Sequence, residues 1–400
     1  MVRPSGPLVN GLRPETALLI LCSRVDLDPQ DRTKRDALIA GLGPCTGRLF
    51  RDAVREGVAP LLHRHLGADV RVSPELRSAL RRVYYAGVSR QFRMQSVLGS
   101  LLRDARDAGL NVIVMKGAYW AESLYPEPGL RPFLDADLLV PPRDGPALRR
   151  ILERAGFIVE GDRRPYGGEG RGGAAWLVSP VYKKYGISVE VHLNPLGLHM
   201  PLRAPEVFWK AARETILSGA PAWVMPWEHE ICYAAIHAQQ HSYERLSWLV
   251  DIAEMARRTP IDWRSAAGLA EQEGLVASVS WALRLVDVLW PDTLPCGTAE
   301  AFALRLWEKG VLKSFWPVSA VAARRIVPPA PFYLPSLFAL ARRRRMAEAC
   351  RVLPTIIFPP RSWVSHYYPA RRGRGVWGHY AWRVAAPWVF LFKRIFLRVE

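Results

Sequence analysis

The sequence contains few cysteines, and no two of them lie close together. Five occur among 400 residues, namely Cys22, Cys45, Cys232, Cys296 and Cys350. An odd number at such wide spacing argues against a framework of disulfides, and the lack of a Cys-x-x-Cys pair argues against a zinc ribbon. This cysteine usage is typical of a reducing compartment, so we expect a cytoplasmic protein.

Long apolar runs are missing as well. No uninterrupted apolar stretch approaches the roughly 20 residues that a membrane-spanning helix needs. A short apolar run at residues 17–22 follows Glu15, and neither its length nor its flanks fit a signal peptide. Internal repeats are also lacking. Half of the residues are hydrophobic, so we expect a globular chain with a sizeable core, divided into two or three domains.

Acidic residues are scarce in the last quarter of the chain. Residues 301–400 contain 18 Lys and Arg against 3 Glu, which accounts for +15 of the net charge of +18. Basic and aromatic residues alternate there, at Arg342 to Arg345, Arg371, Arg372, Arg374, Trp382, Trp388, Phe390, Phe392, Lys393 and Arg394. This composition suits an anionic membrane surface and, less well, nucleic acid. Alternatively, the arginines cover helices and the aromatic rings pack onto the core.

Two carboxylates stand at the start of a short apolar run. Asp135 and Asp137 precede the apolar residues 138–140, which read as a buried strand. Residues two apart on a strand point to the same face. Two adjacent carboxylates repel, and a divalent cation such as Mg²⁺ relieves that repulsion while also binding substrate phosphates. A solvated strand end is the simpler alternative.

A third acid lies on another predicted strand. Residues 187–194 alternate apolar and polar side chains, which places Glu190 and His192 on one face. If this strand lies beside the first, then Asp135, Asp137 and Glu190 form a three-carboxylate site. Such a site can hold Mg²⁺ (or Mn²⁺) for phosphoryl or nucleotidyl transfer. Otherwise Glu190 lies on a solvent-facing surface of the sheet.

Three further residues are candidates for binding phosphate. Lys116 and Gly117 follow the apolar run 112–115 and precede a short predicted helix. Backbone N–H groups at a helix start favour phosphate, glycine permits close approach, and lysine adds positive charge. Lys116 is equally compatible with a buried stem at a strand end. Arg131 precedes a proline and can pair with phosphate, with Asp135 or with Asp137.

The segment 227–325 is predicted to be helical and carries three more polar candidates. His237 and His241 are four residues apart and share a helix face. The pair can bind zinc, although packing between helices or substrate contact suits it better. Asp251 lies in an apolar stretch and needs a partner, for which Arg245 and His241 are candidates. It serves either as a structural ion pair or as a base.

The order of these segments resembles the uncharacterised nucleotidyltransferase family of the DNA polymerase beta-like superfamily. The matching pieces are VMKGAYW, LYPEPGLRPFLDADLLV and VEVHLN, together with VAPLLHRHL and HAQQHSYERLSWLVDIA. The chain departs from the wider superfamily at Lys116-Gly117, where Gly-Gly or Gly-Ser is usual. The resemblance implies an α+β fold with a mixed-sheet nucleotidyltransferase domain. We expect four regions: helical 1–94, nucleotidyltransferase-like 95–226, helical 227–325, and basic, aromatic-rich 326–400.

The resemblance also implies the transfer of a nucleotidyl group from an NTP to an acceptor. Asp135, Asp137 and Glu190 would bind the metal, and Lys116, Gly117 and Arg131 would hold the NTP. The acceptor is unidentified and is expected to be a small molecule, a peptide or a saccharide. The alternative is a non-catalytic module that binds nucleotide, nucleic acid or the inner face of an anionic membrane through its C-terminus. Convergence of the three carboxylates favours the enzyme, whereas a continuous positive face favours the module.

Overall fold

A computed structural model describes residues 12–42, 46–159, 180–195, 206–324 and 334–343, with a few single residues between 358 and 389. Several predicted features lie outside these residues. They include Arg344, Arg345 and the aromatic and basic residues named beyond position 370.

A seven-stranded mixed sheet forms the centre of the molecule, with the order β3-β4-β5-β2-β1-β7-β6. The strands are β1 (Ile113–Met115), β2 (Asp135–Leu139), β3 (Ile158–Val159), β4 (Val181–Lys184), β5 (Ile187–His192), β6 (Arg213–Leu217) and β7 (Ala220–Val224). The pairs β2–β5 and β1–β7 are parallel, and the other neighbouring strands are antiparallel. The predicted α+β class with a mixed sheet is therefore confirmed.

The register of the central strands brings distant parts of the chain together. Met115 at the end of β1 lies opposite Asp137 on β2, and Asp137 lies opposite Glu190 on β5. Partners in register point to the same face of a sheet, and residues two apart on one strand share that face. One face of the sheet therefore presents Asp135, Asp137, Glu190 and His192.

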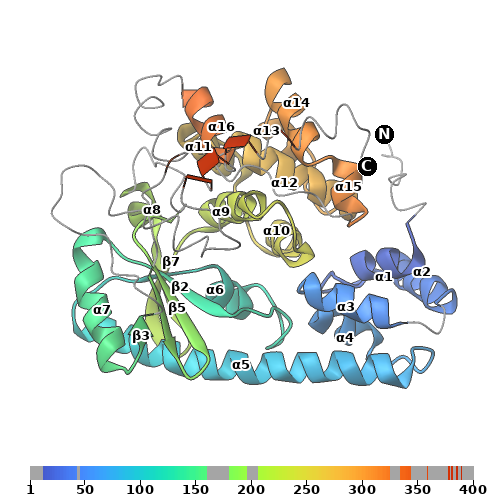
Figure 1. Ribbon diagram of the computed structural model, residues 1–400, viewed down its shortest axis with the longest axis horizontal. Helices are drawn as coiled ribbons and strands as arrows, with labels where there is room; N and C mark the ends of the chain where they lie inside the picture. Colours follow the sequence, from blue (N-terminus) through green and yellow to red (C-terminus); the bar gives the residue numbers. More distant parts are fainter. Residues whose placement is uncertain are drawn as a thin grey trace.

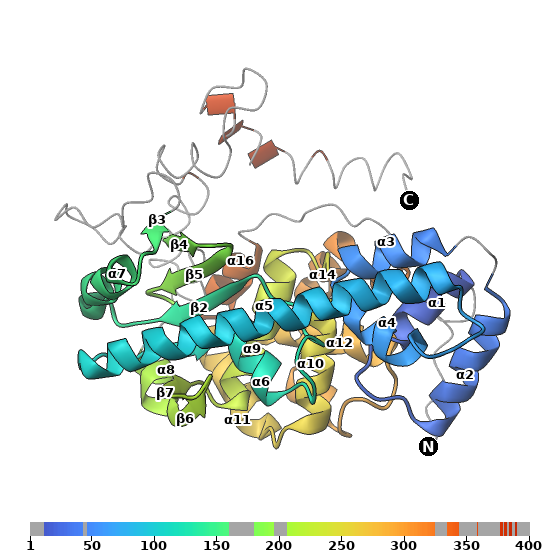
Figure 2. The ribbon, with the colours of Figure 1, turned by 90° about the horizontal axis from the view of Figure 1, so that it is seen from below.

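Four short helices and one long helix precede the sheet. They are α1 (Pro14–Leu21), α2 (Pro29–Ala40), α3 (Gly47–Arg55), α4 (Ala59–Leu66) and α5 (Pro74–Asp107). Helix α5 begins where the Ser73 side chain accepts a hydrogen bond from the Leu76 N–H, and it ends before Gly109, which has a φ of +72°. Figures 1 and 2 show α5 passing beneath both the sheet and the α1–α4 group. Residue 94, the expected domain boundary, lies inside this continuous helix.

The remaining helices lie above the sheet in the view of Figure 1, apart from α6 and α7, which lie at its two sides. They are α6 (Lys116–Ser123), α7 (Gly145–Arg154), α8 (Glu206–Ala211), α9 (Trp227–Gln240), α10 (Leu246–Arg258), α11 (Trp263–Glu273), α12 (Val276–Leu289), α13 (Thr298–Ala301), α14 (Leu306–Phe315), α15 (Val318–Ala322) and α16 (Leu334–Arg343), with a 3-10 turn at Pro142–Asp144. Helix α9 packs against α10, α11 and α12 and reaches α6 through a hydrogen bond from Trp120 to Glu230. No helix within the described ranges combines the length and the apolar character that crossing a membrane requires.

Candidate active site

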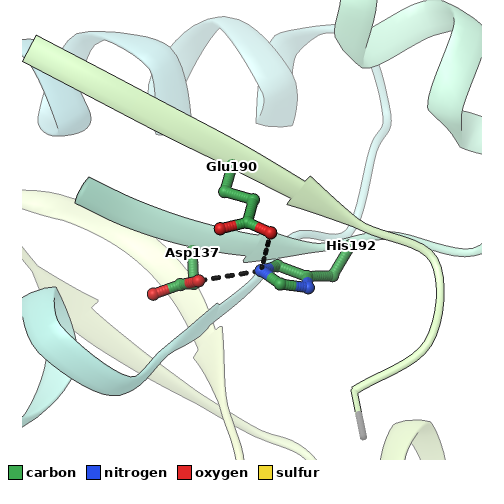
Figure 3. Close-up of side chains that lie close together, drawn as sticks. All are labelled: Asp137, Glu190 and His192. Carbon is green, nitrogen blue, oxygen red and sulfur yellow. Dashed lines mark hydrogen bonds and ion pairs between the residues drawn. The ribbon is translucent and has the colours of Figure 1, made fainter. Parts of the chain in front are cut away.

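Three side chains from the two parallel strands converge at one end of the sheet (Figure 3). The potential ligand atoms of Asp137, Glu190 and His192 lie within 4.8 Å of one another. His192 Nε2 is 2.8 Å from Asp137 Oδ1 and 3.7 Å from Glu190 Oε1. Strand parity predicts that Glu190 joins the Asp137 face, and the register explains why it does. His192 shares that face but was not assigned to the metal site from the sequence.

Asp137 is the most deeply placed of the carboxylates, with 1% of its surface exposed. Burial alone would raise its pKa, but the Lys116 ammonium and the His192 imidazole hold the pKa of Asp137 below its ordinary value. Lys116 Nζ lies 2.9 Å from Asp137 Oδ1, the oxygen that also contacts His192. Asp137 therefore carries a full negative charge at the centre of the site.

Asp135 stands two residues before Asp137 on the same strand face and is partly buried. Burial and, next, the negative charge of Asp137 raise the pKa of Asp135 to about 6. Burial and the neighbouring carboxylate thus both disfavour the charged form of Asp135. A bound divalent cation would remove the repulsion between these carboxylates.

The donor set fits a divalent metal ion. Two carboxylates and one imidazole lie within 4.8 Å of one another, whereas Asp135 is outside this group of three and lies on the same face at the start of β2. Carboxylate oxygens suit Mg²⁺ and Mn²⁺. Glu190 has 27% of its side chain exposed, so this end of the cluster is accessible to a substrate.

Lys116 forms the junction between β1 and α6. Its φ is +47°, and its ammonium lies 5.4 Å from the centre of the Tyr233 ring on α9. The next residue, Gly117, is buried, and a Cβ there would lie only 2.9 Å from the Cβ of Phe133. Packing against the segment that leads into β2 therefore requires glycine at 117. Contacts of either residue with phosphate stay a prediction.

Arg131 is engaged differently from the expectation. Its Nε and Nη2 each lie 2.8 Å from an oxygen of Asp251, and Tyr125 donates a third hydrogen bond to that carboxylate. The guanidinium also lies 5.0 Å from the centre of the Trp120 ring. The predicted structural ion pair of Asp251 is thus confirmed, but the candidate partners Arg245 and His241 were wrong, as were Asp135 and Asp137 for Arg131. The pair instead joins the segment before β2 to helix α10.

Helix α9 directs a row of side chains toward the site. Tyr233, His237 and His241 follow one another on one helix face, and the two histidine rings lie 4.7 Å apart. Trp248 on α10 contacts both histidine rings, at 5.2 and 5.0 Å. Desolvation of the rings and then the charge of Lys116 lower the pKa of His241 to about 4 and hold that of His237 well below its ordinary value. Within the described ranges, neither histidine belongs to a group of three potential metal ligands, so aromatic packing accounts for the pair better than zinc.

Glu230 lies on the same face of α9 and was not singled out from the sequence. It is fully buried and accepts a hydrogen bond of 2.9 Å from Trp120 Nε1. Burial raises the pKa of Glu230 to about 8, so the folded protein holds this acid mostly neutral at pH 7. The only sequence signal was a glutamate within the apolar helix WEHEICYAAI.

A mixed sheet with carboxylates on two adjacent parallel strands, and a helix that starts beside them, defines a nucleotidyltransferase-like domain. The sequence profile of the uncharacterised nucleotidyltransferase family matches residues 46–291, which is more than half of the chain. The chain therefore belongs to this family, as its sequence motifs predict. Searches among curated proteins and among solved structures returned no match.

Proposed function

We propose that this protein is a metal-dependent nucleotidyltransferase that transfers a nucleotidyl group from an NTP to an unidentified small molecule, peptide or saccharide. The observation that carries the proposal is the register of β2 and β5, which pairs Asp137 with Glu190 beside the N-terminus of α6. Asp135 adds a carboxylate with a raised pKa to the same face. Such crowding of acids is typical of a site built for a cation.

Asp135, Asp137 and Glu190 would hold Mg²⁺ or Mn²⁺, with His192 orienting Asp137 through its hydrogen bond. The metal supplies positive charge that stabilises the phosphate oxygens during transfer. The acceptor hydroxyl oxygen would attack the α-phosphorus, and the bond to pyrophosphate would break. Glu190 is the most exposed acid within the cluster of Figure 3 and would take the proton of the hydroxyl group.

Lys116 and the backbone N–H groups that open α6 would bind the triphosphate. The ammonium has three donors, of which one goes to Asp137. Gly117 would contribute its backbone N–H group at the helix start. Arg131 would act at longer range, since its guanidinium is bound to Asp251.

The nucleobase would stack on the ring cluster of α9 and α10. Ring contacts lead from the Lys116 ammonium through Tyr233 and His237 to His241 and Trp248. His241 is exposed and Trp248 is half-buried, so a planar ligand can reach this end of the cluster. Because their lowered pKa values keep both histidines neutral at pH 7, their rings offer flat faces without added charge.

The experiment that tests the proposal uses labelled NTPs. Purified protein is incubated with Mg²⁺ or Mn²⁺, each of four α-³²P-labelled NTPs in turn, and a cell extract depleted of large proteins. We expect one or more extract components to become labelled by the natural protein but not by Asp137→Asn. The matched control is Asp104→Asn, an exposed acid on α5, which should label as the natural protein does. Equal labelling by Asp137→Asn would contradict the proposal.

The alternative function as a binding module depends on the basic C-terminal quarter. Arg342, the first of the four consecutive arginines, is bound to Glu308 and Glu271 and is 6% exposed. It therefore fastens α16 to α14 and α11 and contributes little to a binding surface. For the tail, we propose that the protein is cytoplasmic and that its residues beyond 370 bind the inner face of the membrane.

A further inference from the structure

Lys116 adopts a backbone conformation that lysine rarely takes. Its φ of +47° lies in the left-handed region, where a Cβ crowds the following carbonyl and glycine is the favoured residue. Helix α6 starts at this residue, and the buried Met115 precedes it. A strained residue that persists at a site indicates that its side chain is needed there.

The side chain ends on the metal cluster. Lys116 Nζ lies 2.9 Å from Asp137 Oδ1, and His192 Nε2 lies 2.8 Å from the same oxygen. Among the residues that the structure describes, no hydrogen bond reaches the other oxygen of Asp137. Asp137 Oδ1 therefore binds the Lys116 ammonium and the His192 imidazole, and the other carboxylate oxygen can bind a metal ion.

In a centre with two metal ions, both oxygens of such a carboxylate bind metal. The two ions lie about 3.5–4 Å apart and clamp the attacking and leaving oxygens of one phosphoryl group, so a central carboxylate has to serve both ions. Here the ammonium occupies the position beside Oδ1. The ammonium also lies over the Tyr233 ring, 5.4 Å from its centre, and this cation–π contact favours that position.

We propose that the Lys116 ammonium takes the place of a second metal ion, so that the centre binds one divalent cation. One divalent ion and one ammonium balance the charges of the three carboxylates Asp135, Asp137 and Glu190. The remaining N–H donors of Lys116 then face the triphosphate, as the second ion would. This inference rests on the proposed nucleotidyltransferase function and specifies the cation content of its active site.

The test counts Mn²⁺ ions. Protein is dialysed to equilibrium against MnCl₂ with inorganic tripolyphosphate, bound Mn²⁺ per chain is measured, and electron paramagnetic resonance shows whether the ions are isolated or spin-coupled. Asp137→Asn gives the background of binding elsewhere. Lys116→Gly removes the ammonium and suits the left-handed backbone. Lys116→Asn is the second variant, because asparagine also tolerates that conformation and keeps the test decisive if the glycine variant fails to fold.

Tyr185→Gly is the matched control for relief of strain. Tyr185 has a φ of +46° and is 92% exposed in the turn between β4 and β5, away from the carboxylates. We expect one isolated Mn²⁺ per chain in the natural protein and in Tyr185→Gly, and a coupled pair in the Lys116 variants. A coupled pair in the natural protein, or a single ion in both Lys116 variants, would overturn the inference and leave the proposed function standing. Binding no greater than that of Asp137→Asn would instead contradict the proposed function.

Discussion

Replacing Glu230 with glutamine tests how deeply the α9 face is shielded from water. The folded protein raises the pKa of Glu230 from its ordinary 4.5 to about 8, chiefly through burial. The folded state thus holds the proton more tightly than the unfolded state does. The stabilisation from this group is fully present below the pKa that Glu230 has in the unfolded state. It is lost as the pH rises through the pKa of the folded state.

The size of the effect follows from that shift. Each pKa unit corresponds to about 1.4 kcal/mol, so ionisation lowers the free energy of unfolding by about 5 kcal/mol at most. Glutamine keeps the acceptor for Trp120 Nε1 but does not titrate. As the pH rises from about 5 to about 9, the natural protein should therefore lose about 3–4 kcal/mol of its free energy of unfolding relative to Glu230→Gln.

Urea unfolding curves at both pH values measure this loss, with metal-free protein at one salt concentration. Glu228→Gln is the matched control on the same helix, because Glu228 is only partly buried and its acceptor role toward the Asp262 N–H survives the change. We expect the control to follow the natural protein at both pH values. A constant difference between Glu230→Gln and the natural protein across the range would refute the account of a buried neutral acid.

Three further predictions concern the rest of the molecule. Arg131→Met leaves the buried carboxylate of Asp251 without its ion pair, so it should lower the free energy of unfolding by about 3–5 kcal/mol in urea titrations; the double variant Arg131→Met, Asp251→Leu should recover part of that loss, and no recovery would argue against the pair. Trp248→Ala removes a stacking surface worth about 1–3 kcal/mol per base, so calorimetry should show a Kd for NTP raised about tenfold and an unchanged Kd for tripolyphosphate; an equal rise for both would contradict base stacking. The triple variant Arg371→Gln, Arg372→Gln, Arg374→Gln should sediment less with anionic liposomes at low salt, since each arginine contributes about 1 kcal/mol to membrane binding. Unchanged sedimentation would contradict the membrane proposal.

The sequence predicts those parts of the site that depend on local geometry. Alternation along a strand determines which residues share a face, and this places Asp135 with Asp137 and Glu190 with His192. The adjacency of β2 and β5 was an assumption that family resemblance supported and the sheet order confirms. Likewise, Gly109 predicts the end of the helix before β1, because a left-handed residue there closes its last turn.

The parts that depend on packing between distant segments were not predictable in the same way. Arg131 and Asp251 are 120 residues apart, and nothing local to either distinguishes this partner from Arg245 or His241. Glu230 acquires its raised pKa only when α9 folds over α6 and excludes water. The position of His192 was predictable, because strand alternation places it on the same face as Glu190. The prediction assigned only carboxylates to the metal site and therefore left His192 out.

The backbone conformation of Lys116 bears on the departure of Lys116-Gly117 from the superfamily pattern. The wider superfamily usually has glycine at this position, and a φ of +47° accommodates glycine without strain. Lysine at the same backbone position extends its side chain to Asp137. On our proposal, lysine at this position replaces one cation of the site with its own ammonium and leaves the fold unchanged.

The central claim is that Asp137 organises a metal-dependent NTP site, and calorimetry of nucleotide binding tests it most directly. Each of the four NTPs is titrated into the natural protein, Asp137→Asn and Asp104→Asn, with Mn²⁺ and then with EDTA in its place. We expect at least one NTP to bind the natural protein and Asp104→Asn only with metal, and to bind Asp137→Asn at least tenfold more weakly, a loss of about 1.4 kcal/mol or more. Metal-independent binding, or equal binding by Asp137→Asn, would contradict the central claim.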